Sequence, residues 1–324
     1  MTTSRDGPAA GLTVGLFVFN RPSLTAQVLT AIADAQPERV LVVGDGPRDD
    51  HPEDKRLVAA VRSAVSDIDW PCEVSTYYAD VNLGCGRRIA SGLGWIFEQA
   101  GEAVILEDDC LPHPSFFRYC GELLRRYRND DRVHMLAGAN VLGETRMCGP
   151  YSYHFSRCYS IWGWATWARA WRGYDFEMRD WPKLRTESWL KHRVPTRQAE
   201  RIVRQLLDDT YADPSQGWDF GWTLAGWRRD AVCAVPVVNL VTNTGHGDSA
   251  THLRWKDHPF ASVPRNEIQF PLKHPPDVAA CEAADREIWA RLYPEFAGYV
   301  RGSIGQRLLR AAQGVSKRAF ARRV

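Results

Sequence analysis

Val104-Ile105-Leu106-Glu107-Asp108-Asp109-Cys110 joins a short apolar run to three consecutive carboxylates. In a parallel α/β sheet such a run is typical of a buried strand, and ligands bind at the C-terminal ends of these strands. Three adjacent acids repel one another unless water or a cation offsets the repulsion. Carboxylates in this position suit Mg²⁺ or Mn²⁺, held together with substrate phosphates. The alternative is an acidic strand-to-loop turn that binds no metal.

The segments before this stretch alternate between strand and helix patterns. Strands are predicted at 12–19, 39–43 and 73–78, and helices at 24–35, 53–68 and from loop 82–88 to about 99. This alternation predicts an α/β fold, Rossmann-like, with a mostly parallel sheet flanked by helices. The strand ends would bring Arg21, Asp45 and the acidic triplet to one rim, with Arg87 and Arg88 nearby.

Arginines and carboxylates that converge on one rim suit a nucleotide diphosphate with its metal. The arginines and the metal meet phosphate oxygens, while a carboxylate binds a base N–H or a ribose hydroxyl. The sequence has no Walker A motif, and no G-x-G-x-x-G follows the first strand. Kinase and dehydrogenase functions therefore lose their main support.

The second half of the chain is less regular. Helices are predicted at 114–128, 200–207 and 218–229, and strands at 133–136, 151–160 and 231–238. Many of the 13 tryptophans lie between Trp162 and Trp227. The spacing of Trp164, Trp167 and Trp171 is helical and favours a buried stripe, although flat rings also serve as platforms for sugar rings.

Composition limits the class of protein. The 324 residues are 44% hydrophobic and 25% charged, which is ordinary for a globular chain. A net charge of +2 argues against nucleic acid as a partner. No secretory leader is visible, and the apolar runs are too short to span a bilayer. The eight cysteines are scattered without a C-x-x-C pair, which predicts free thiols in a cytoplasmic protein. Abundant alanine and arginine suggest a bacterial source.

An ordered series of motifs carries a resemblance to a known family. It comprises Phe19-Asn20-Arg21, Gly44-Asp45-Gly46, 82–88, Phe97, the triplet 107–109, 114–117, Gly163-Trp164 with Trp171, Trp218-Asp219 and the loop 239–252. The chain resembles GT-A-fold glycosyltransferases of the family 2 type over residues 12–255, and within them is similar to N-acetylglucosaminyltransferase I. We accordingly divide it into a flexible tail at 1–10, a GT-A domain at 11–274 and a basic helical extension at 275–324.

The resemblance implies a metal-dependent, inverting transfer of a sugar from a nucleotide-diphosphate donor, expected to be UDP-linked. The sites that it implies are the following. Asn20, Arg21, Asp45, Arg88, Glu107, Asp108 and Trp164 would bind the nucleotide sugar, Asp109 and His252 the Mn²⁺ or Mg²⁺, and Asp219 would be the catalytic base. The family often has histidine in the place of Arg88. The acceptor hydroxyl is not identified by this resemblance.

The chemistry is also reasonable without the family. An inverting transfer needs a carboxylate that removes a proton from the acceptor hydroxyl, and cations that stabilise the leaving diphosphate. Tryptophans flank Asp219 and would raise the pKa of its carboxyl by desolvation. Asp213 and Glu107 are its rivals as base.

Simpler explanations exist for several of these residues. Gly-Asp-Gly around Asp45 is also plain turn chemistry, and Asp219 could be an acid in a helix first turn. His252 could be solvated, exposed arginines often have no specific role, and Trp164 could pack in the core. The alternative functions are a sugar-phosphate nucleotidyltransferase and a non-catalytic protein that binds sugar nucleotides.

The end of the chain is basic and amphipathic. Leu308, Leu309, Ala312, Val315 and Phe320 lie among six cationic residues, with no acid after Arg301. Such a segment predicts peripheral contact with an anionic membrane surface at the inner face of the membrane. The alternative is a solvated tail.

Overall fold

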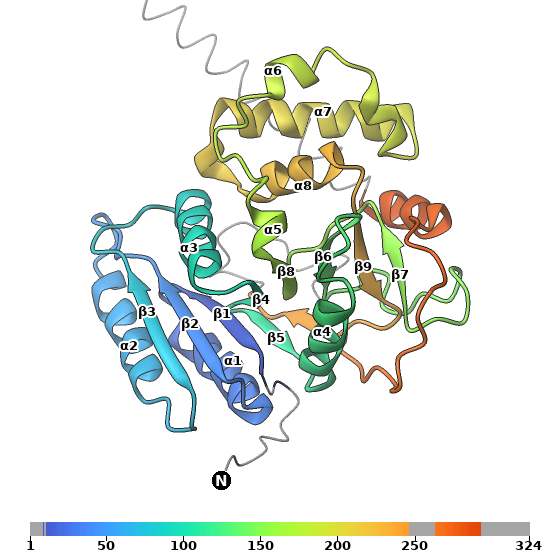
Figure 1. Ribbon diagram of the computed structural model, residues 1–324. Coiled ribbons are helices and arrows are strands. Elements are labelled where there is room, and N and C mark those ends of the chain that lie inside the picture. Colours follow the sequence, from blue (N-terminus) through green and yellow to red (C-terminus); the bar gives the residue numbers. More distant parts are fainter. Residues whose placement is uncertain (1–8, 10, 246–262, 293–324) are drawn as a thin grey trace, which may run out of the picture.

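The computed structural model describes residues 9, 11–245 and 263–292, and Figure 1 shows an α/β fold built on a twisted sheet. The first half alternates strands and helices as the pattern predicts. Its elements are β1 (Thr13–Val18), α1 (Pro22–Ala35), β2 (Arg39–Gly44), α2 (Asp54–Ser66), β3 (Glu73–Tyr78), α3 (Cys85–Gln99) and β4 (Glu102–Glu107). Pro22 opens α1, where its fixed φ suits the first helical turn.

The second half is built from shorter elements. They are β5 (Cys110–Pro112), α4 (Ser115–Arg126), β6 (Val133–Ala137), β7 (Tyr153–Ser156), β8 (Trp164–Trp167), α5 (Ala168–Trp171), α6 (Trp181–Leu184), η1 (Trp189–His192), α7 (Arg197–Ala212), η2 (Pro214–Gln216), α8 (Asp219–Arg228), β9 (Val232–Pro236) and β10 (Val241–Asn243). A further helix spans 282–292.

The main sheet has eight strands in the order β3-β2-β1-β4-β8-β6-β9-β7. The pairs β3–β2, β2–β1, β1–β4 and β6–β9 are parallel, while β8 and β7 pair antiparallel with their neighbours. The predicted α/β fold with a mostly parallel sheet is therefore confirmed. After β3 the chain returns to the other side of β1, so the strand order reverses between β1 and β4. This switch point is where open α/β sheets bind ligands.

Both faces of the sheet are buried along β1, β2 and β4. Leu16 and Val42 face one way and pack with residues of α1, α2 and α4, whereas Phe17 and Val43 face α3. Strands covered on both sides are continuously apolar, as β1, β2 and β4 are. Each buried Leu, Val or Phe contributes about 1.5–3 kcal/mol to this core.

The tryptophan-rich segment forms a strand where helical spacing was predicted. Trp164 and Trp167 lie on β8, between β4 and β6, and only Trp171 is helical. The prediction that they are buried is correct, because Trp164 and Trp167 are each 1% exposed. Trp164 and Trp167 point to opposite faces, since they belong to different core clusters. Aromatic residues suit a central strand, so sheet packing overrides the helical spacing.

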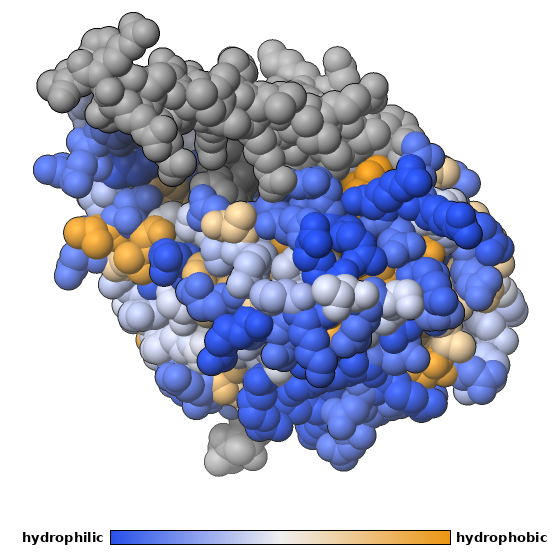
Figure 2. All heavy atoms as spheres, turned by 90° about the horizontal axis from the view of Figure 1, so that it is seen from above, coloured by the Kyte–Doolittle hydropathy of each residue, from blue (hydrophilic) through white to orange (hydrophobic). Residues whose placement is uncertain are grey.

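Helices α6, α7 and α8 stand together at one end of the sheet (Figure 1). Their shared apolar cluster includes Trp181, Leu207 and Trp227, and also Trp289 from the helix at 282–292. The outer surface on this side, seen in Figure 2, is mostly hydrophilic with scattered apolar residues. The cluster therefore gives this helical layer a core of its own.

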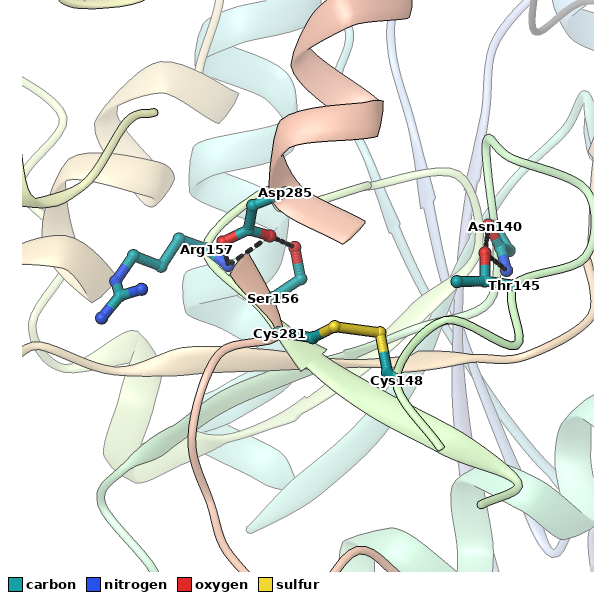
Figure 3. Close-up of a disulfide and its surroundings, with 7 residues drawn as sticks. All are labelled: Asn140, Thr145, Cys148, Ser156, Arg157, Cys281 and Asp285. Atoms are coloured by element: carbon teal, nitrogen blue, oxygen red, sulfur yellow. Dashed lines mark hydrogen bonds between the residues drawn. A yellow bond between two sulfur atoms is a disulfide. The ribbon is translucent and has the colours of Figure 1, made fainter. Parts of the chain in front are cut away.

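The helix at 282–292 is anchored to the rest of the molecule. Its Asp285 accepts hydrogen bonds from Ser156 Oγ at 2.5 Å and from the Arg157 N–H at 3.2 Å, as Figure 3 shows. A disulfide joins Cys148 to Cys281, with 6.0 Å between the Cα atoms. The prediction of free thiols throughout is thus wrong for these two cysteines, which lie 133 residues apart and leave no short spacing to detect. The cytoplasmic location stays a prediction.

In the described part of the chain, no helix has the length and apolar character needed to cross a membrane. The proposed domain boundary at 274/275 stays a prediction.

Candidate functional site

Arg21 and the acidic triplet meet at the switch point. Arg21 follows β1 and precedes α1, while Asp108 and Asp109 follow β4, so neighbouring parallel strands deliver the two groups to one rim. Arg21 Nη1 donates to Asp109 Oδ2 at 2.7 Å, and Arg21 Nη2 donates to Asp108 Oδ1. The backbone N–H of Phe19 donates to Asp108 Oδ2 at 3.2 Å. One guanidinium therefore bridges both carboxylates.

The short antiparallel pair β5–β10 brings a second chain segment to Asp109. The backbone N–H of Thr244 donates to the Asp109 carbonyl oxygen at 2.7 Å. Asn243 Nδ2 lies 3.5 Å from Asp109 Oδ1, and the same side chain accepts from the Gly245 N–H at 2.8 Å. A Cβ added to Gly245 would lie 2.1 Å from Asp109 Oδ2 and 2.9 Å from Arg21 Nη1. Only glycine fits against this ion pair.

Electrostatics mark the cluster as unusual. Burial, followed by the charges of Asp109 and Asp108, raises the pKa of Glu107 to about 8. Burial also raises the pKa of Asp108 to about 6, although Arg21 opposes this shift. For Arg21 itself, burial lowers the pKa, but the attraction of the two carboxylates outweighs it and the net shift is upward. Strongly shifted carboxyls in a cluster are typical of functional sites.

Asp219 belongs to the same electrostatic cluster. It is the first residue of α8, and its charge contributes to the raised pKa of Glu107 and of the Cys85 thiol, after burial in both cases. Gly86 makes the approach of this segment possible, because a Cβ there would lie 2.6 Å from the Ser215 carbonyl oxygen. The start of α3 and the turn before α8 are thereby held in backbone contact. The raised pKa expected for Asp219 stays a prediction.

The carboxylate of Asp45 is engaged in hydrogen bonds within the protein. Its carboxylate accepts from the N–H groups of Gly46 and Leu83 at 2.9 Å and of Gly84 at 3.0 Å. It also accepts from Asn82 Nδ2 at 3.1 Å. Asp45 thus ties the end of β2 to the loop that opens α3, which matches the simpler explanation from turn chemistry. Its contact with a nucleotide stays a prediction.

Asn20 and Arg88 are also engaged elsewhere. Asn20 Nδ2 donates to Asp54 Oδ1 at 2.7 Å, next to Arg48 Nε, which donates to Asp54 Oδ2 at 2.6 Å. Arg88 is buried, donates to the Tyr77 carbonyl oxygen, and holds its guanidinium 4.2 Å from the centre of the Tyr77 ring. Neither pairs with the triplet, so the structure does not bring them together with Arg21.

Trp164 fits the core better than a sugar platform. Its ring is 1% exposed and lies 5.7 Å from Trp218 and 5.5 Å from Trp222, centroid to centroid. The expected contact between Trp164 and a sugar does not fit this burial, because the ring has no free face. Trp164 instead supports Trp218, which immediately precedes Asp219.

Sequence reasoning missed Asp54, Arg48, Asn243 and Gly245. Asn243 and Gly245 lie in the 239–252 loop, yet only the pairing of β5 with β10 shows which part of it touches Asp109. His252 lies outside the described residues.

Among residues 9, 11–245 and 263–292, no three Asp, Glu, His or Cys side chains converge closely enough to hold a metal ion. In the cluster, Arg21 pairs with Asp108 and Asp109, and its charge also acts on Glu107. The expectation that Asp109 holds Mn²⁺ or Mg²⁺ stays a prediction.

A cavity of about 300 Å³ lies at the opposite, N-terminal ends of β1, β2 and β4, beside Arg39, Glu102 and Arg128. Both arginines are paired there, Arg39 with Glu73 and Arg128 with Glu102. We place the site at the acidic cluster, because shifted carboxyls and a ligand-binding switch point coincide there.

Comparisons with known proteins give limited similarity. No family model matches the chain, and no curated protein matches it. A UDP-glucose pyrophosphorylase solved with UDP-glucose shares 14% identity and a TM-score of 0.24, over 36% of this chain and 55% of that one. The chain thus spans about half the length of that protein. The apo form of a UDP-glucose pyrophosphorylase gives a TM-score of 0.36 at 9% identity, over 72% and 93% of the two chains.

The apo structure of the bifunctional glycosyltransferase WbbM shares 14% identity and a TM-score of 0.29, over 74% of this chain and 40% of that one. Two of these structures are named as UDP-glucose pyrophosphorylases and the third as a glycosyltransferase, but similarities of this size carry no argument about function. They do not support the finer resemblance to N-acetylglucosaminyltransferase I.

Proposed function

We propose that this chain is a glycosyltransferase that moves a sugar from a nucleotide-diphosphate donor, most simply a UDP-sugar, to an acceptor hydroxyl with inversion. The observation that carries the proposal is the cluster at the switch point, where Arg21 bridges Asp108 and Asp109 while Asp219 contributes to the same field. It unites a cationic donor for phosphate, carboxylates for ribose and metal, and a separate acid on α8.

Each group has a defined task in this proposal. Arg21 would bind the leaving diphosphate, whose charge grows as the glycosidic bond breaks. Asp108 would accept a hydrogen bond from a ribose hydroxyl, and Asp219 would take the proton of the acceptor hydroxyl. Asp109 would hold Mn²⁺ or Mg²⁺, which supplies charge neutralisation of the diphosphate when bound.

The first test is binding, measured as thermal stabilisation by UDP, GDP, dTDP and CDP, each with and without Mn²⁺. A ligand at ~100 times its Kd adds about 2.7 kcal/mol of stability, which is easily detected. We expect one nucleotide to stabilise the wild type and Asp109→Ala to lose that gain. Asp69→Ala, which removes an exposed acid between α2 and β3, should be stabilised by the nucleotide as much as the wild type is. No stabilisation by any nucleotide would refute the proposal.

The second step separates transfer from binding. Asp219→Asn should still bind the selected nucleotide, while its rate of donor consumption falls by about 10²–10⁴-fold. If the wild type makes a nucleotide sugar and pyrophosphate from a nucleoside triphosphate and a sugar phosphate, it is a nucleotidyltransferase instead. Nucleotide binding without any turnover would indicate a non-catalytic sugar-nucleotide-binding protein.

A further inference from the structure

Asp54, the first residue of α2, is a buried carboxylate with both oxygens engaged, and its side chain is 3% exposed. Oδ1 accepts from Asn20 Nδ2 at 2.7 Å and from Arg48 Nη2 at 3.0 Å. Oδ2 accepts from Arg48 Nε at 2.6 Å and from the Arg48 N–H at 3.2 Å. Side-chain hydrogen bonding from Arg48 lowers the pKa of Asp54 to about 2, so Asp54 is an anion at neutral pH. An ionised carboxylate only accepts hydrogen bonds, so the amide nitrogen of Asn20 faces it.

This carboxylate joins three chain segments beyond the C-terminal ends of β1 and β2. Asn20 belongs to the turn between β1 and α1, Arg48 to the loop between β2 and α2, and Asp54 to α2 itself. An acid in the first turn of a helix is already stabilised by the helix dipole. The dipole accounts for an acid at the start of α2, but it does not account for the bond from Asp54 to the turn at Asn20.

Asn20 stands between the two residues of this turn that contact the acidic triplet. The N–H of Phe19, before it, donates to Asp108 Oδ2 at 3.2 Å. The guanidinium of Arg21, after it, donates to Asp108 and Asp109. The turn is therefore tied to the end of β4 through Phe19 and Arg21, and to α2 through Asn20.

Arg48 strengthens the link between α2 and the turn. Its guanidinium carbon lies 5.3 Å from the centre of the Phe19 ring, while its Nε and Nη2 hold Asp54. A charge-assisted hydrogen bond is roughly twice as strong as a neutral one, so the bond from Asn20 to this buried anion is a firm one. A misplacement of about 1 Å in a site costs about 10²-fold in rate, so the turn that carries Arg21 gains from a fixed support.

We propose that Asp54 is a positioning residue of the switch-point cluster: through Asn20 it fixes the turn that presents the Phe19 N–H and the Arg21 guanidinium to the acidic triplet. Its effect is indirect, because its own partners are Asn20 and Arg48. That the positioned Arg21 then meets a diphosphate rests on the proposed function.

Amide hydrogen exchange, measured by NMR, follows the turn directly. Asp54→Ala and Asn20→Ala should each speed exchange of the Phe19 N–H by about ten-fold or more relative to that of Leu16 in β1, because a hydrogen bond to a charged group is lost. The double variant should exchange no faster than Asp54→Ala, since both changes remove one contact. Asp285→Ala, which removes a buried acid bound to Ser156 next to β7, should leave the ratio unchanged.

A purely structural role for Asp54 would give a different result. Asp54→Ala would then speed the exchange of Phe19 and Leu16 alike, which would overturn the inference. An unchanged ratio in Asn20→Ala, or effects that add in the double variant, would also overturn it. Asn20→Ala keeps the ion pair between Asp54 and Arg48, so this variant tests the inference even if Asp54→Ala does not fold.

Binding of UDP connects the turn with the site. Asp54→Ala and Asn20→Ala should bind UDP with a Kd about ten-fold higher than that of the wild type, whereas Asp285→Ala should match the wild type. Wild-type affinity in both turn variants would overturn the inference. The exchange measurement needs no nucleotide, so failure of UDP to bind the wild type counts against the proposed function and not against the role of Asp54.

Discussion

His134 on β6 and His154 on β7 are buried, and their imidazole rings stay neutral in mild acid, where an exposed histidine becomes charged. Burial lowers the pKa of His134 to about 3 and that of His154 to about 4. His134 packs on Trp222, with 3.8 Å between ring centroids, so a charged imidazole would be desolvated there. Between the folded and unfolded pKa values the unfolded chain binds more protons. Stability from each neutral histidine is therefore complete above about pH 6.5 and is lost as the pH falls.

We predict that His134→Phe, which keeps an aromatic ring, reduces this acid sensitivity. Between about pH 7 and about pH 5 one such histidine removes about 2 kcal/mol from the free energy of unfolding. As the pH falls over this interval, the free energy of unfolding of the variant should therefore rise by this amount relative to that of the wild type. Urea unfolding at each pH measures this difference. His192→Gln, at an exposed position, should follow the wild type. A constant difference at all pH values would contradict the prediction.

At individual residues, the sequence predicts the position of the cluster better than it predicts the contacts of Asp45 and Arg88. Arg21, Asp108 and Asp109 could be placed together because parallel strands end on one rim. Three of the four hydrogen bonds on Asp45 come from Asn82, Leu83 and Gly84 and depend on the path of loop 82–84, which no residue pattern specifies. The burial of Arg88 on Tyr77 is likewise a tertiary contact.

At the scale of elements, the disulfide fixes the start of the 282–292 helix. It closes a loop of 133 residues, and the backbone bridge between Phe155 and Ala280 lies next to it. In the chain-entropy description a cross-link over such a loop stabilises the fold by restricting the unfolded chain, by about 3–5 kcal/mol. The helix carries Asp285 and Trp289 into contact with the sheet and with α7 and α8.

We predict that reduction of this disulfide lowers the free energy of unfolding by about 3–5 kcal/mol, measured by urea unfolding with and without a reducing agent. Hydrogen exchange over 282–292 should accelerate first, because this helix loses its covalent tie. Cys281→Ser should have the lower free energy of unfolding of the reduced wild type, both with and without the reducing agent. If the reducing agent does not change the urea midpoint of the wild type, the disulfide does not stabilise the fold and the prediction is wrong.

Elements in the first half could be predicted almost to the residue, because β1, β2 and β4 each contain a continuous apolar run. Glycine, proline or polar residues separate each strand from the next helix. In the second half, the helical spacing of Trp164, Trp167 and Trp171 indicates a buried stripe but does not indicate the strand β8. Its place between β4 and β6 arises from long-range pairing. The β5–β10 pair is three residues long on each side and has no pattern of its own.

For the whole molecule, charge is distributed unevenly along the chain. The sequence has 41 basic and 39 acidic residues, a net charge of +2. Residues 302–324, which lie outside the described part of the chain, hold six of the basic residues and no acid, so residues 1–301 carry 35 basic and 39 acidic residues, a net charge of −4. An anionic surface would therefore attract the end of the chain and repel the remainder.

This asymmetry makes membrane binding by the full chain a test of residues 302–324. Each Lys or Arg near an anionic surface contributes about 1 kcal/mol, and the effect falls within a Debye length. We predict that the protein co-sediments with vesicles rich in phosphatidylserine, that added salt releases it, and that phosphatidylcholine vesicles leave it in solution. Replacing the six basic residues of 302–324 by glutamine should abolish binding, whereas six such changes at exposed arginines elsewhere should not. If both variants partition like the wild type, residues 302–324 do not bind the membrane and form a solvated tail.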